Sequence, residues 1–452
     1  PCRPAAGDAA QGSGVSVAAN PSSTWARWVE AAKVYRSRKQ LIILLMGFSS
    51  GAPFLLTGAV LSTWMGTINV NLTTIGLFAL VGTPYAFKFV WAPLVDRLPL
   101  PVLDGWLGRR RSWMLLSQGL LLGAVLWLAW TDPVTVPWST AAAAVAVAFC
   151  SATQDIVIDA YRIELLRDEE QGAGSATTQL GYRIATWTVD AIALLLPAFL
   201  PWGMVLTIIG LFGLVGIVTT FYAHEPRPEK HALTSLGGSW FNQAVIRPFA
   251  EFIAHRGWLL ILLFALFYKY GDALGGTMAR PFYIQMGFQL PEIFAVTKSF
   301  GAAATVLGGI LGGVVVARYG LFKALLVAGI LQAVTNLLFV WQAQVGHDIV
   351  VLTIAITADY FTGALGGVAF IGYLSSLCTA GMAGTQYALL TSLMAAGRTW
   401  LSAGGGWLAA HTGWSVFWML TTLLAIPGLL LLLWLWHVTQ KETPPSGMKE
   451  GQ

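Results

Sequence analysis

Long apolar runs separated by short polar segments dominate the 452-residue chain. A helix needs about 20 consecutive apolar residues to cross a bilayer. The first run, Leu41 to Met65, is too long for the apolar core of a signal peptide and lacks a small-residue cleavage site, so we expect it to be retained. Later runs predict further helices over residues 72–95, 112–130, 137–160, 175–199, 202–222, 258–280, 289–317, 321–341, 348–374, 386–411 and 414–436. The pattern predicts an all-α membrane protein with 12 transmembrane helices.

The composition excludes the soluble classes of protein. Hydrophobic residues make up 56% of the chain and charged residues only 10%, whereas soluble domains carry about 25% charged residues. Three Cys are too few for a disulfide scaffold, and 20 Trp with 23 Phe are too many for a disordered chain. The His and Cys residues show no metal-ligand spacing, so we expect no metal site and no other cofactor.

The placement of Lys and Arg predicts the orientation in the membrane. Of the 26 basic residues, twenty fall in the segments on the side of the N-terminus, and Arg280 is the one expected on the other side. Cytoplasmic loops carry an excess of basic residues, so we expect both termini in the cytoplasm. Basic residues beside anionic headgroups also account for the net charge of +5 without nucleic acid as a partner.

One long polar stretch divides the apolar runs six and six, which predicts two six-helix bundles. The expected organisation is a flexible tail (1–24), an interfacial amphipathic helix (25–40), an N-terminal bundle (41–222), a cytoplasmic linker with an amphipathic helix (223–257), a C-terminal bundle (258–437) and a cytoplasmic tail (438–452).

Two loops, one in each predicted half, have similar sequences. Both resemble the loop motif of the major facilitator superfamily. One loop comprises Pro93 to Arg97 followed by Gly108 to Arg111, and the other runs from Gly312 to Gly320 after the eighth run. That resemblance implies two parallel six-helix halves around a binding site near the membrane midplane.

Two glycine patterns favour helix packing over chemistry. Gly47 to Gly51 matches the nucleophile elbow of hydrolases, but that motif needs a strand-to-helix turn and this one lies inside a predicted membrane helix. We therefore do not expect an enzyme. The pairs Gly308/Gly312 and Gly309/Gly313 have the spacing that permits close helix approach.

Ionisable residues inside the predicted helices are the strongest functional signal. A charge at the bilayer centre costs about 2.5–3.5 kcal/mol, so nine facing lipid would cost roughly 20–30 kcal/mol, above the about 5–15 kcal/mol stability of a typical domain. They must face water, pair with one another or become neutral. Pairing that merely holds helices together is the structural alternative. The nine are Lys88, Asp155, Arg183, Asp190, Lys269, Asp272, Lys298, Asp359 and Arg398.

Sequence spacing suggests partners for some of these charges. Lys269 and Asp272 are three residues apart and Arg183 and Asp190 are seven apart, so local pairing is plausible for both couples. Asp155 and Asp159 are four apart, and mutual repulsion would favour protonation of one carboxyl. We expect Asp155 to carry the proton. We expect Asp159 to pair with loop arginines in a cytoplasmic gate, whose candidate residues are Asp96, Arg97, Arg109, Arg110, Arg111 and Asp159.

The nine charges comprise five cations and four anions, and this excess of positive charge fits an anionic solute. Aromatic residues beside the charges suit sugar rings, although ordinary packing explains each one equally well. They are Tyr85, Tyr182, Trp187, Tyr268, Tyr360 and Trp400.

Several polar motifs inside the predicted helices, spread from Leu41 to Trp436, resemble the AmpG muropeptide permeases. They are Phe87–Pro93, Ser151–Ala160, Gly172–Gly174, Gly181–Arg183, Tyr268–Ala273 and Gly384–Leu390. The resemblance implies proton-driven import of N-acetylglucosamine-anhydro-N-acetylmuramyl peptides across the bacterial inner membrane for cell-wall recycling. The family also contributes to β-lactamase induction through the imported fragments.

The resulting hypothesis is a monomeric proton symporter driven by the proton gradient. Asp155 couples the proton; Lys88, Arg183, Lys269, Lys298 and Arg398 meet solute carboxylates or act as counter-charges; and Gln154, Asp272 and Asp359, with Tyr85, bind the polar groups of the substrate. A symporter for another anionic amphiphile or a short peptide, and a non-transporting membrane scaffold, remain alternatives.

Overall fold

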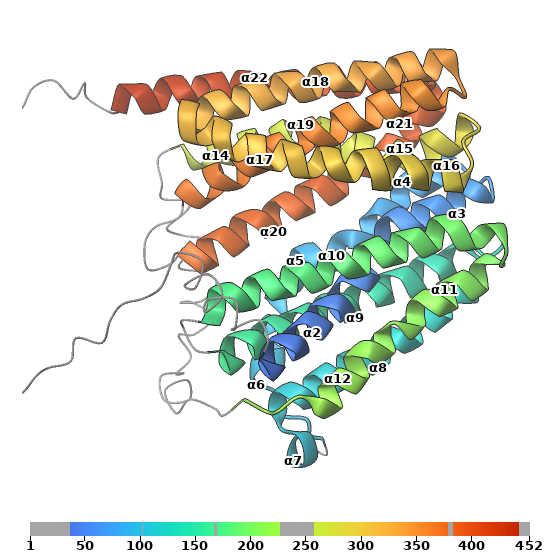
Figure 1. Cartoon of the computed structure of the whole chain (residues 1–452), viewed down its shortest axis with the longest axis vertical. Helices are drawn as coiled ribbons and strands as arrows, with labels where there is room; N and C mark the ends of the chain where they lie inside the picture. Colours follow the sequence, from blue (N-terminus) through green and yellow to red (C-terminus); the bar gives the residue numbers. More distant parts are fainter. Residues whose placement is uncertain (1–36, 102, 167–169, 227–256, 378–382, 443–452) are drawn as a thin grey trace, which may run out of the picture.

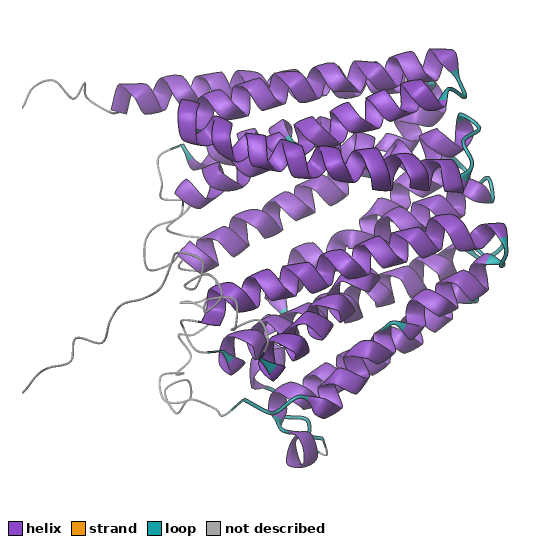
Figure 2. Ribbon diagram, viewed as in Figure 1, coloured by secondary structure: helices purple, strands orange, loops and turns teal. Residues whose placement is uncertain are grey.

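The computed structural model describes residues 37–101, 103–166, 170–226, 257–377 and 383–442. Helices account for the regular structure of these residues (Figure 2), as the sequence predicts. The two tails, most of the interfacial helix expected at 25–40 and most of the linker expected at 223–257 lie outside the described ranges. Arg38 to Gln40, the end of that expected interfacial helix, form the first turn of a long helix.

The first bundle has six crossings, joined between the second and third by the short helices α6 (Ala92–Arg97) and α7 (Asp104–Leu107). The crossings are α2 (Arg38–Leu55) with the π-helical turn η2 (Leu56–Val60) and α3 (Leu61–Thr67); α4 (Leu72–Leu77) with η3 (Phe78–Gly82), α5 (Thr83–Phe87) and η4 (Lys88–Val90); α8 (Arg109–Ala129); α9 (Pro137–Leu165); α10 (Gln171–Leu195) with η6 (Leu196–Ala198); and α11 (Trp202–Leu211) with α12 (Gly213–Tyr222).

The second bundle repeats this plan with six further crossings (Figure 1). They are α14 (Trp258–Tyr268) with α15 (Tyr270–Gln285); α16 (Leu290–Ala295) with the π-helical turn η9 (Val296–Gly301) and α17 (Ala302–Tyr319); α18 (Leu321–Val345); α19 (Ile349–Ser376); α20 (Ala383–Ser402) with α21 (Gly405–Thr412); and α22 (Trp414–Glu442).

Ten of these crossings are long and apolar enough to span a membrane. The other two are α10, which carries Arg183 and Asp190, and α20, which is separated from α21 by Ala403 and Gly404. Both lie among the apolar helices of their bundles (Figure 1). With them the described chain has the 12 helical crossings that the sequence predicts.

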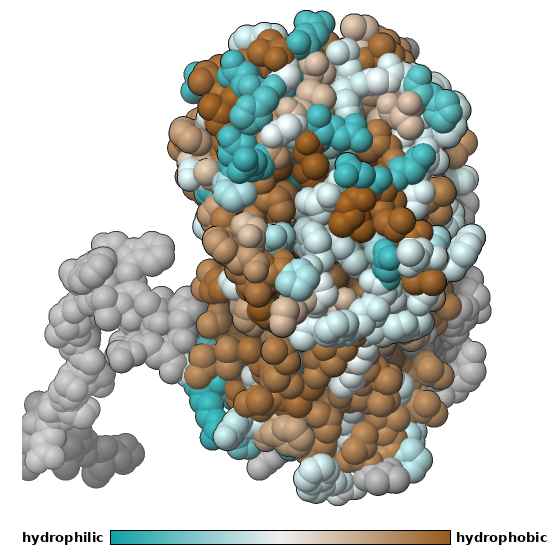
Figure 3. Space-filling model, turned by 90° about the vertical axis from the view of Figure 1, so that its right-hand side faces the viewer, coloured by the Kyte–Doolittle hydropathy of each residue, from teal (hydrophilic) through white to brown (hydrophobic). Residues whose placement is uncertain are grey.

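The helices begin and end at two faces, which differ in charge. The basic face carries Arg38, Arg109, Arg318 and Lys323 near helix ends, and it holds the C-terminal end of α22. At the opposite face, the loops 68–71, 130–136, 199–201, 286–289 and 346–348 contain no Lys or Arg. Figure 3 views this opposite face and shows apolar residues over the end of the N-terminal bundle. Trp130, Trp138 and Phe199 are exposed there, as is typical of aromatic side chains at a membrane interface.

Polar side chains and backbone conformation set several helix ends. The Ser37 hydroxyl accepts a hydrogen bond from the Gln40 N–H, at 3.3 Å, where α2 begins. Gly108 precedes α8 with φ of +86°, and the Glu225 carboxylate accepts from the N–H groups of Arg110 (2.8 Å) and Arg111 (3.1 Å). A Cβ atom at position 108 would lie 2.5 Å from Glu225 Cγ, so this close approach needs glycine. Glu225 therefore joins the end of α12 to the start of α8.

Small residues let helices within a bundle pack closely. A Cβ atom on Gly47 or Gly51 of α2 would lie 2.3–2.5 Å from backbone oxygens of α10. A Cβ atom on Gly308 of α17 would lie 2.2 Å from the Phe361 carbonyl oxygen of α19, while one on Gly309 would meet nothing within 4 Å. Both glycine motifs therefore lie in helices, and the first of the two Gly-x-x-x-Gly pairs makes the helix contact.

The two bundles contact each other mainly in the half of the molecule near the opposite face. Near this face α4 contacts α21, α3 contacts α15, and α10 contacts α16, while α5 contacts α20 further toward the basic face. Gly76 of α4 and Gly406 of α21 bring two backbones together, since a Cβ atom on Gly406 would lie 1.8 Å from the Leu72 carbonyl oxygen. A buried apolar cluster continues across this contact from Met65 to Met278.

Candidate functional site

The first polar cluster lies inside the N-terminal bundle, where α2 contacts α9. The Ser50 hydroxyl donates a hydrogen bond to Asp155 Oδ1 at 2.5 Å, and Gln154 Nε2 donates to the Ser49 hydroxyl at 3.2 Å. Lys88 of η4 is the cation that interacts electrostatically with Asp155. Ser49 and Ser50 of α2 thus contact Gln154 and Asp155 of α9. Asp155, the predicted proton carrier, also interacts with Lys88, a predicted substrate-binding cation.

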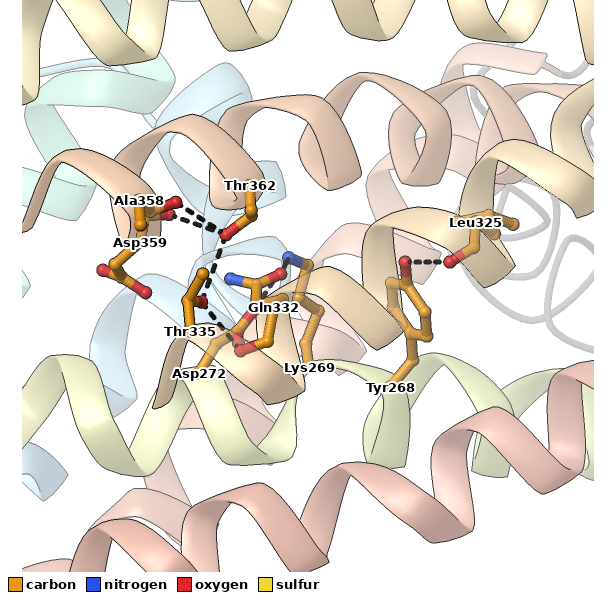
Figure 4. A network of polar contacts seen from close by, with 9 residues as sticks. All are labelled: Tyr268, Lys269, Asp272, Leu325, Gln332, Thr335, Ala358, Asp359 and Thr362. Carbon is orange, nitrogen blue, oxygen red and sulfur yellow. Dashed lines mark hydrogen bonds and ion pairs between the residues drawn. The ribbon is translucent and has the colours of Figure 1, made fainter. Parts of the chain in front are cut away.

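The second cluster lies inside the C-terminal bundle (Figure 4). Lys269 Nζ is 2.8 Å from Asp272 Oδ2 and donates to Gln332 Oε1 at 3.4 Å. Lys269 occupies the junction between α14 and α15, so the two partners lie three residues apart, as the sequence suggests. The Asp359 carboxylate of α19 lies near this pair and interacts with both of its charges. Two carboxylates and one ammonium therefore share this region.

The third cluster joins the two bundles. Asp190 of α10 accepts hydrogen bonds from Arg280 Nη2 of α15, at 2.9 Å to each carboxylate oxygen, and its Oδ2 is 2.6 Å from Lys298 Nζ of η9. The side chains of Asp190 and Arg280 are 6% and 11% exposed. Lys298 also lies over the Trp187 ring, 5.8 Å from its centroid. One carboxylate therefore holds two cations of the other bundle in a buried position.

This third cluster corrects two expectations. Arg280 was expected outside the membrane, but it lies within α15, which continues to Gln285. Spacing made a pairing of Asp190 with Arg183 on its own helix plausible, yet the described partners of Asp190 are Arg280 and Lys298, and Arg183 is exposed. Spacing along one helix cannot reveal a partner on another bundle. The apolar run that follows Arg280, from Pro281 to Ile284, is the sequence signal that it lies inside a span.

The arginines of the basic face pair with different acids from those expected. Arg110 and Arg109 contact Glu164, at 2.5 Å and 3.6 Å, and Arg111 donates to the Thr220 and Phe221 carbonyl oxygens. The described partner of Asp159 is Arg162, at 3.5 Å, rather than the arginines at 109–111. Asp159 and Arg162 are three residues apart on α9, which favours this local pair. The side chains of Asp96 and Arg97 lie outside the description.

Two cavities lie next to these clusters. The interbundle cavity, of about 420 Å³, lies between α2–α5 of one bundle and α15 and α20 of the other, and its lining includes Tyr85, Asp272 and Arg398. The C-bundle cavity, of about 270 Å³, lies among α15, α17, α18 and α19, and its lining includes Asp272, Gln332 and Asp359. The lining of both cavities contains Asp272 and Gly276, so the two spaces meet at α15.

The other predicted residues are distributed around these spaces. Arg398 is exposed on α20 and Arg183 on α10. Trp400 Nε1 donates to the Thr83 hydroxyl of the N-terminal bundle at 3.3 Å, and the Trp400 ring stacks on Phe87. Tyr268 donates to the Leu325 carbonyl oxygen at 2.9 Å, which favours a packing role for this tyrosine. In the described part of the chain, no group of three or more His, Cys, Asp or Glu side chains could hold a metal ion.

A polytopic helical protein with two six-helix bundles and charged cavities between and within them belongs to the class of membrane carriers. The family model that matches residues 41–402 is the Major Facilitator Superfamily, and the chain belongs to that superfamily and to its AmpG family of permeases.

Two relatives illustrate the family match. The anhydromuropeptide permease of Escherichia coli (strain K12) is 37% identical over 403 residues, which cover 89% of this chain and 80% of the relative. The putative transporter AmpG 4 of Rickettsia felis is 34% identical over 89% of this chain and 98% of its own length.

Solved structures with low identity agree on the fold. The nucleoside transporter NupG superposes with a TM-score of 0.66 at 14% identity, covering 88% of this chain and 99% of that one. A bacterial homologue of the human lysosomal transporter Spinster, in an inward-facing and unoccupied conformation, gives 0.68 at 14% identity, covering 91% and 99%. At this low identity, the similarity shows a shared fold and nothing about the solute.

Proposed function

We propose that the chain is a proton-coupled symporter that imports N-acetylglucosamine-anhydro-N-acetylmuramyl peptides from the periplasm to the cytoplasm. The observation that carries the proposal is the interbundle cavity lined by Tyr85, Asp272 and Arg398, in a chain 37% identical to an anhydromuropeptide permease. Such a solute has sugar hydroxyls, amides and peptide carboxylates. An exposed arginine suits the carboxylates, and carboxylate and amide side chains suit the hydroxyls.

The charge difference between the two faces supports an orientation in the bacterial inner membrane. The basic face is cytoplasmic in our proposal, since cytoplasmic segments carry the excess of Lys and Arg. The opposite face is then periplasmic, and the bundles contact each other on that side. In our proposal this arrangement is the state that releases the solute to the cytoplasm. Import requires a second state, in which the bundles separate at the periplasmic face and the solute enters. We propose that one chain suffices.

Asp155 couples the proton in this proposal. The proton gradient is the energy source, and no cofactor takes part. The carboxyl group accepts a hydrogen bond from Ser50 and interacts electrostatically with Lys88. Protonation removes the negative charge that attracts Lys88, so the ammonium can then interact with a carboxylate of the solute. Loss of the proton on the cytoplasmic side restores the original attraction and favours release of the solute.

The remaining predicted residues have roles in the same cycle. In this proposal Tyr85, Gln154, Asp272 and Asp359 hydrogen-bond the solute, and Lys88, Arg183, Lys269, Lys298 and Arg398 act on its carboxylates or balance buried charge. The cytoplasmic gate consists of Asp96, Arg97, Arg109, Arg110, Arg111 and Asp159, to which the Glu164 partner of Arg110 is added.

Uptake into proteoliposomes tests this function. Labelled anhydromuropeptide should accumulate in vesicles of the purified chain only when an inward pH gradient is imposed. Asp155→Asn should abolish accumulation and retain exchange of labelled for unlabelled solute across the vesicle membrane. Asp132→Asn, at an exposed loop of the opposite face, is the matched control and should accumulate solute as the parent does. Accumulation by Asp155→Asn equal to that of the parent would contradict the coupling role.

Competition distinguishes this substrate from a simpler one. Complete anhydromuropeptide should inhibit uptake far better than the free peptide does. Equal inhibition by a short peptide without sugar would instead indicate a peptide symporter. Failure of every labelled muropeptide to enter vesicles of correctly folded protein would overturn the proposal as a whole.

A further inference from the structure

The two cavities that meet at α15 differ in chemistry. The C-bundle cavity has two carboxylates in its wall, Asp272 and Asp359, together with the amides of Gln332 and Asn336. The nearest described ammonium, that of Lys269, already pairs with Asp272. Further carboxylates are therefore repelled from this cavity, whereas neutral hydroxyl groups can donate hydrogen bonds to its oxygens.

Aromatic side chains complete the wall of the C-bundle cavity. Tyr283, Tyr360 and Trp418 line it, and they offer flat apolar surfaces beside the polar groups. The amide groups of Gln332 and Asn336 in the same wall can donate hydrogen bonds as well as accept them. Acceptors, donors and ring faces together are the set that a neutral pyranose with an acetamido group requires.

The interbundle cavity offers the opposite charge. Arg398 is exposed on its wall and makes no ion pair with another described residue, and the acid in this lining is Asp272, which is paired with Lys269. Much of the remaining lining is small or apolar, including Leu55, Gly58 and Ala79. An extended peptide with a terminal carboxylate fits this composition.

Cavity size argues that both spaces are used. Sites for small molecules usually have volumes of about 300–1,000 Å³. The C-bundle cavity, at about 270 Å³, is below this range, and the interbundle cavity, at about 420 Å³, is near its lower end. A ligand made of sugars and a peptide needs the two together. Gly276 lines both cavities, and an added Cβ atom at this position would have no heavy atom within 4 Å.

We propose that the substrate binds across both cavities in one orientation. Its N-acetylglucosamine end lies in the C-bundle cavity, and its peptide lies in the interbundle cavity with a carboxylate on Arg398. The inference rests on the proposed function and goes beyond it, because it assigns each part of the substrate to a different bundle.

Two substitutions test the binding of the two ends of the ligand separately. Asn336→Leu replaces an amide of the C-bundle cavity by an apolar side chain of similar size, and Arg398→Gln removes the exposed charge. Each variant is tested with three unlabelled competitors of muropeptide uptake: N-acetylglucosamine, the free peptide and the complete anhydromuropeptide. Asn336→Leu should weaken inhibition by N-acetylglucosamine by about tenfold and spare that by the peptide, whereas Arg398→Gln should do the reverse. Both should weaken inhibition by the complete ligand.

A substitution at the junction tests whether one ligand occupies both spaces. Gly276→Leu should fill the space beside this glycine, and it should weaken binding of the complete anhydromuropeptide at least about tenfold more than binding of either fragment. Gly313→Leu is the matched control, because an added Cβ atom at this exposed position of α17 also meets no heavy atom within 4 Å. It should bind all three ligands as the parent does. Thermal unfolding of each purified variant verifies that it folds.

The outcomes distinguish this inference from the proposed function. If Asn336→Leu and Arg398→Gln weaken both fragments equally, or affect the fragments in the reverse order, the orientation is wrong while muropeptide transport stands. If the parent takes up no anhydromuropeptide, the proposed function fails first. Equal effects of Gly276→Leu on the fragments and on the complete ligand would show that the ligand does not cross the junction.

Discussion

Glu225 illustrates how one side chain acts at the end of the N-terminal bundle. Its carboxylate accepts from two N–H groups at the start of α8, outside the apolar spans, while burial raises the pKa of this carboxyl above its usual value of 4.5. A carboxyl whose pKa is higher in the folded state stabilises that state fully below the unfolded pKa. This contribution is lost as the pH rises through the folded pKa.

We therefore predict a pH-dependent difference between the parent and Glu225→Gln. The apparent melting temperature of the parent should rise relative to that of Glu225→Gln as the pH is lowered from 7 toward 4.5, and the difference should be flat below that. Glu225→Ala should be the least stable, because it removes a helix cap worth about 0.5–2 kcal/mol. A difference independent of pH would contradict the assigned environment.

The Lys269–Asp272 pair leads to a second prediction at this scale. Removing one member of a fully buried pair typically costs about 3–5 kcal/mol, and we expect less here because each side chain is 24% exposed. Lys269→Gln and Asp272→Asn should each lower the melting temperature, and the double variant should lose less than the sum of the two losses. Additive losses would show that the two charges do not stabilise each other.

The positions of the buried charges could be predicted from the sequence better than the partners of these charges could. The Lys269–Asp272 contact follows from spacing on one segment, and the structure contains it. The partners of Asp190 come from a different bundle, so no spacing along α10 could identify them. The role of Glu164 was missed for a similar reason, since it lies at the end of α9 and its partner Arg110 lies in the first turn of another helix, α8.

At the scale of elements, hydropathy predicted which segments form helices, but it did not predict where every helix begins or where one is divided. The predicted span 202–222 coincides with Trp202–Tyr222, whereas α8 begins at Arg109 rather than 112 because charged residues continue the helix beyond the apolar run. The span expected over 386–411 is divided at Ala403 and Gly404. Hydropathy does not reveal such a break, since apolar and small residues continue on both sides of it.

Two neighbouring glycines of α17 provide a matched test of helix packing. Gly308→Ala should destabilise the protein by about 1–3 kcal/mol, because its Cβ atom would lie 2.2 Å from the Phe361 carbonyl oxygen. Gly309→Ala places the same methyl group in open space and should leave the melting temperature unchanged or raise it slightly. Equal melting temperatures for the two variants would mean that α17 and α19 are not in close contact.

At the scale of the whole molecule, Asp190 and its two cations hold the bundles together near the opposite face. Asp190→Asn leaves Arg280 and Lys298 buried without their carboxylate, which penalises the closed arrangement. We predict that this variant populates the state open at the opposite face more than the parent does.

Spin labels measure this shift. Cysteines at the exposed positions Val134 and Val350, on the loop side of each bundle, report the separation of the bundles when the native cysteines are replaced. Asp190→Asn should increase the population of long distances. Asp132→Asn removes the same charge from an exposed loop and should leave the distance distribution as in the parent. Identical distributions for all three proteins would exclude Asp190 as a gate residue.

The backbone contact between Gly76 and Gly406 limits how that opening can occur. Because a methyl group on Gly406 would overlap the Leu72 carbonyl oxygen, the two backbones touch at this point with no side chain between them. We therefore expect α4 and α21 to separate as rigid helices when the opposite face opens, without a gradual rearrangement of side chains at this point. A Gly406→Ala substitution would then keep α4 and α21 apart by a steric clash. Such a carrier should still take up solute at the opposite face, but it should return slowly to the state that releases the solute.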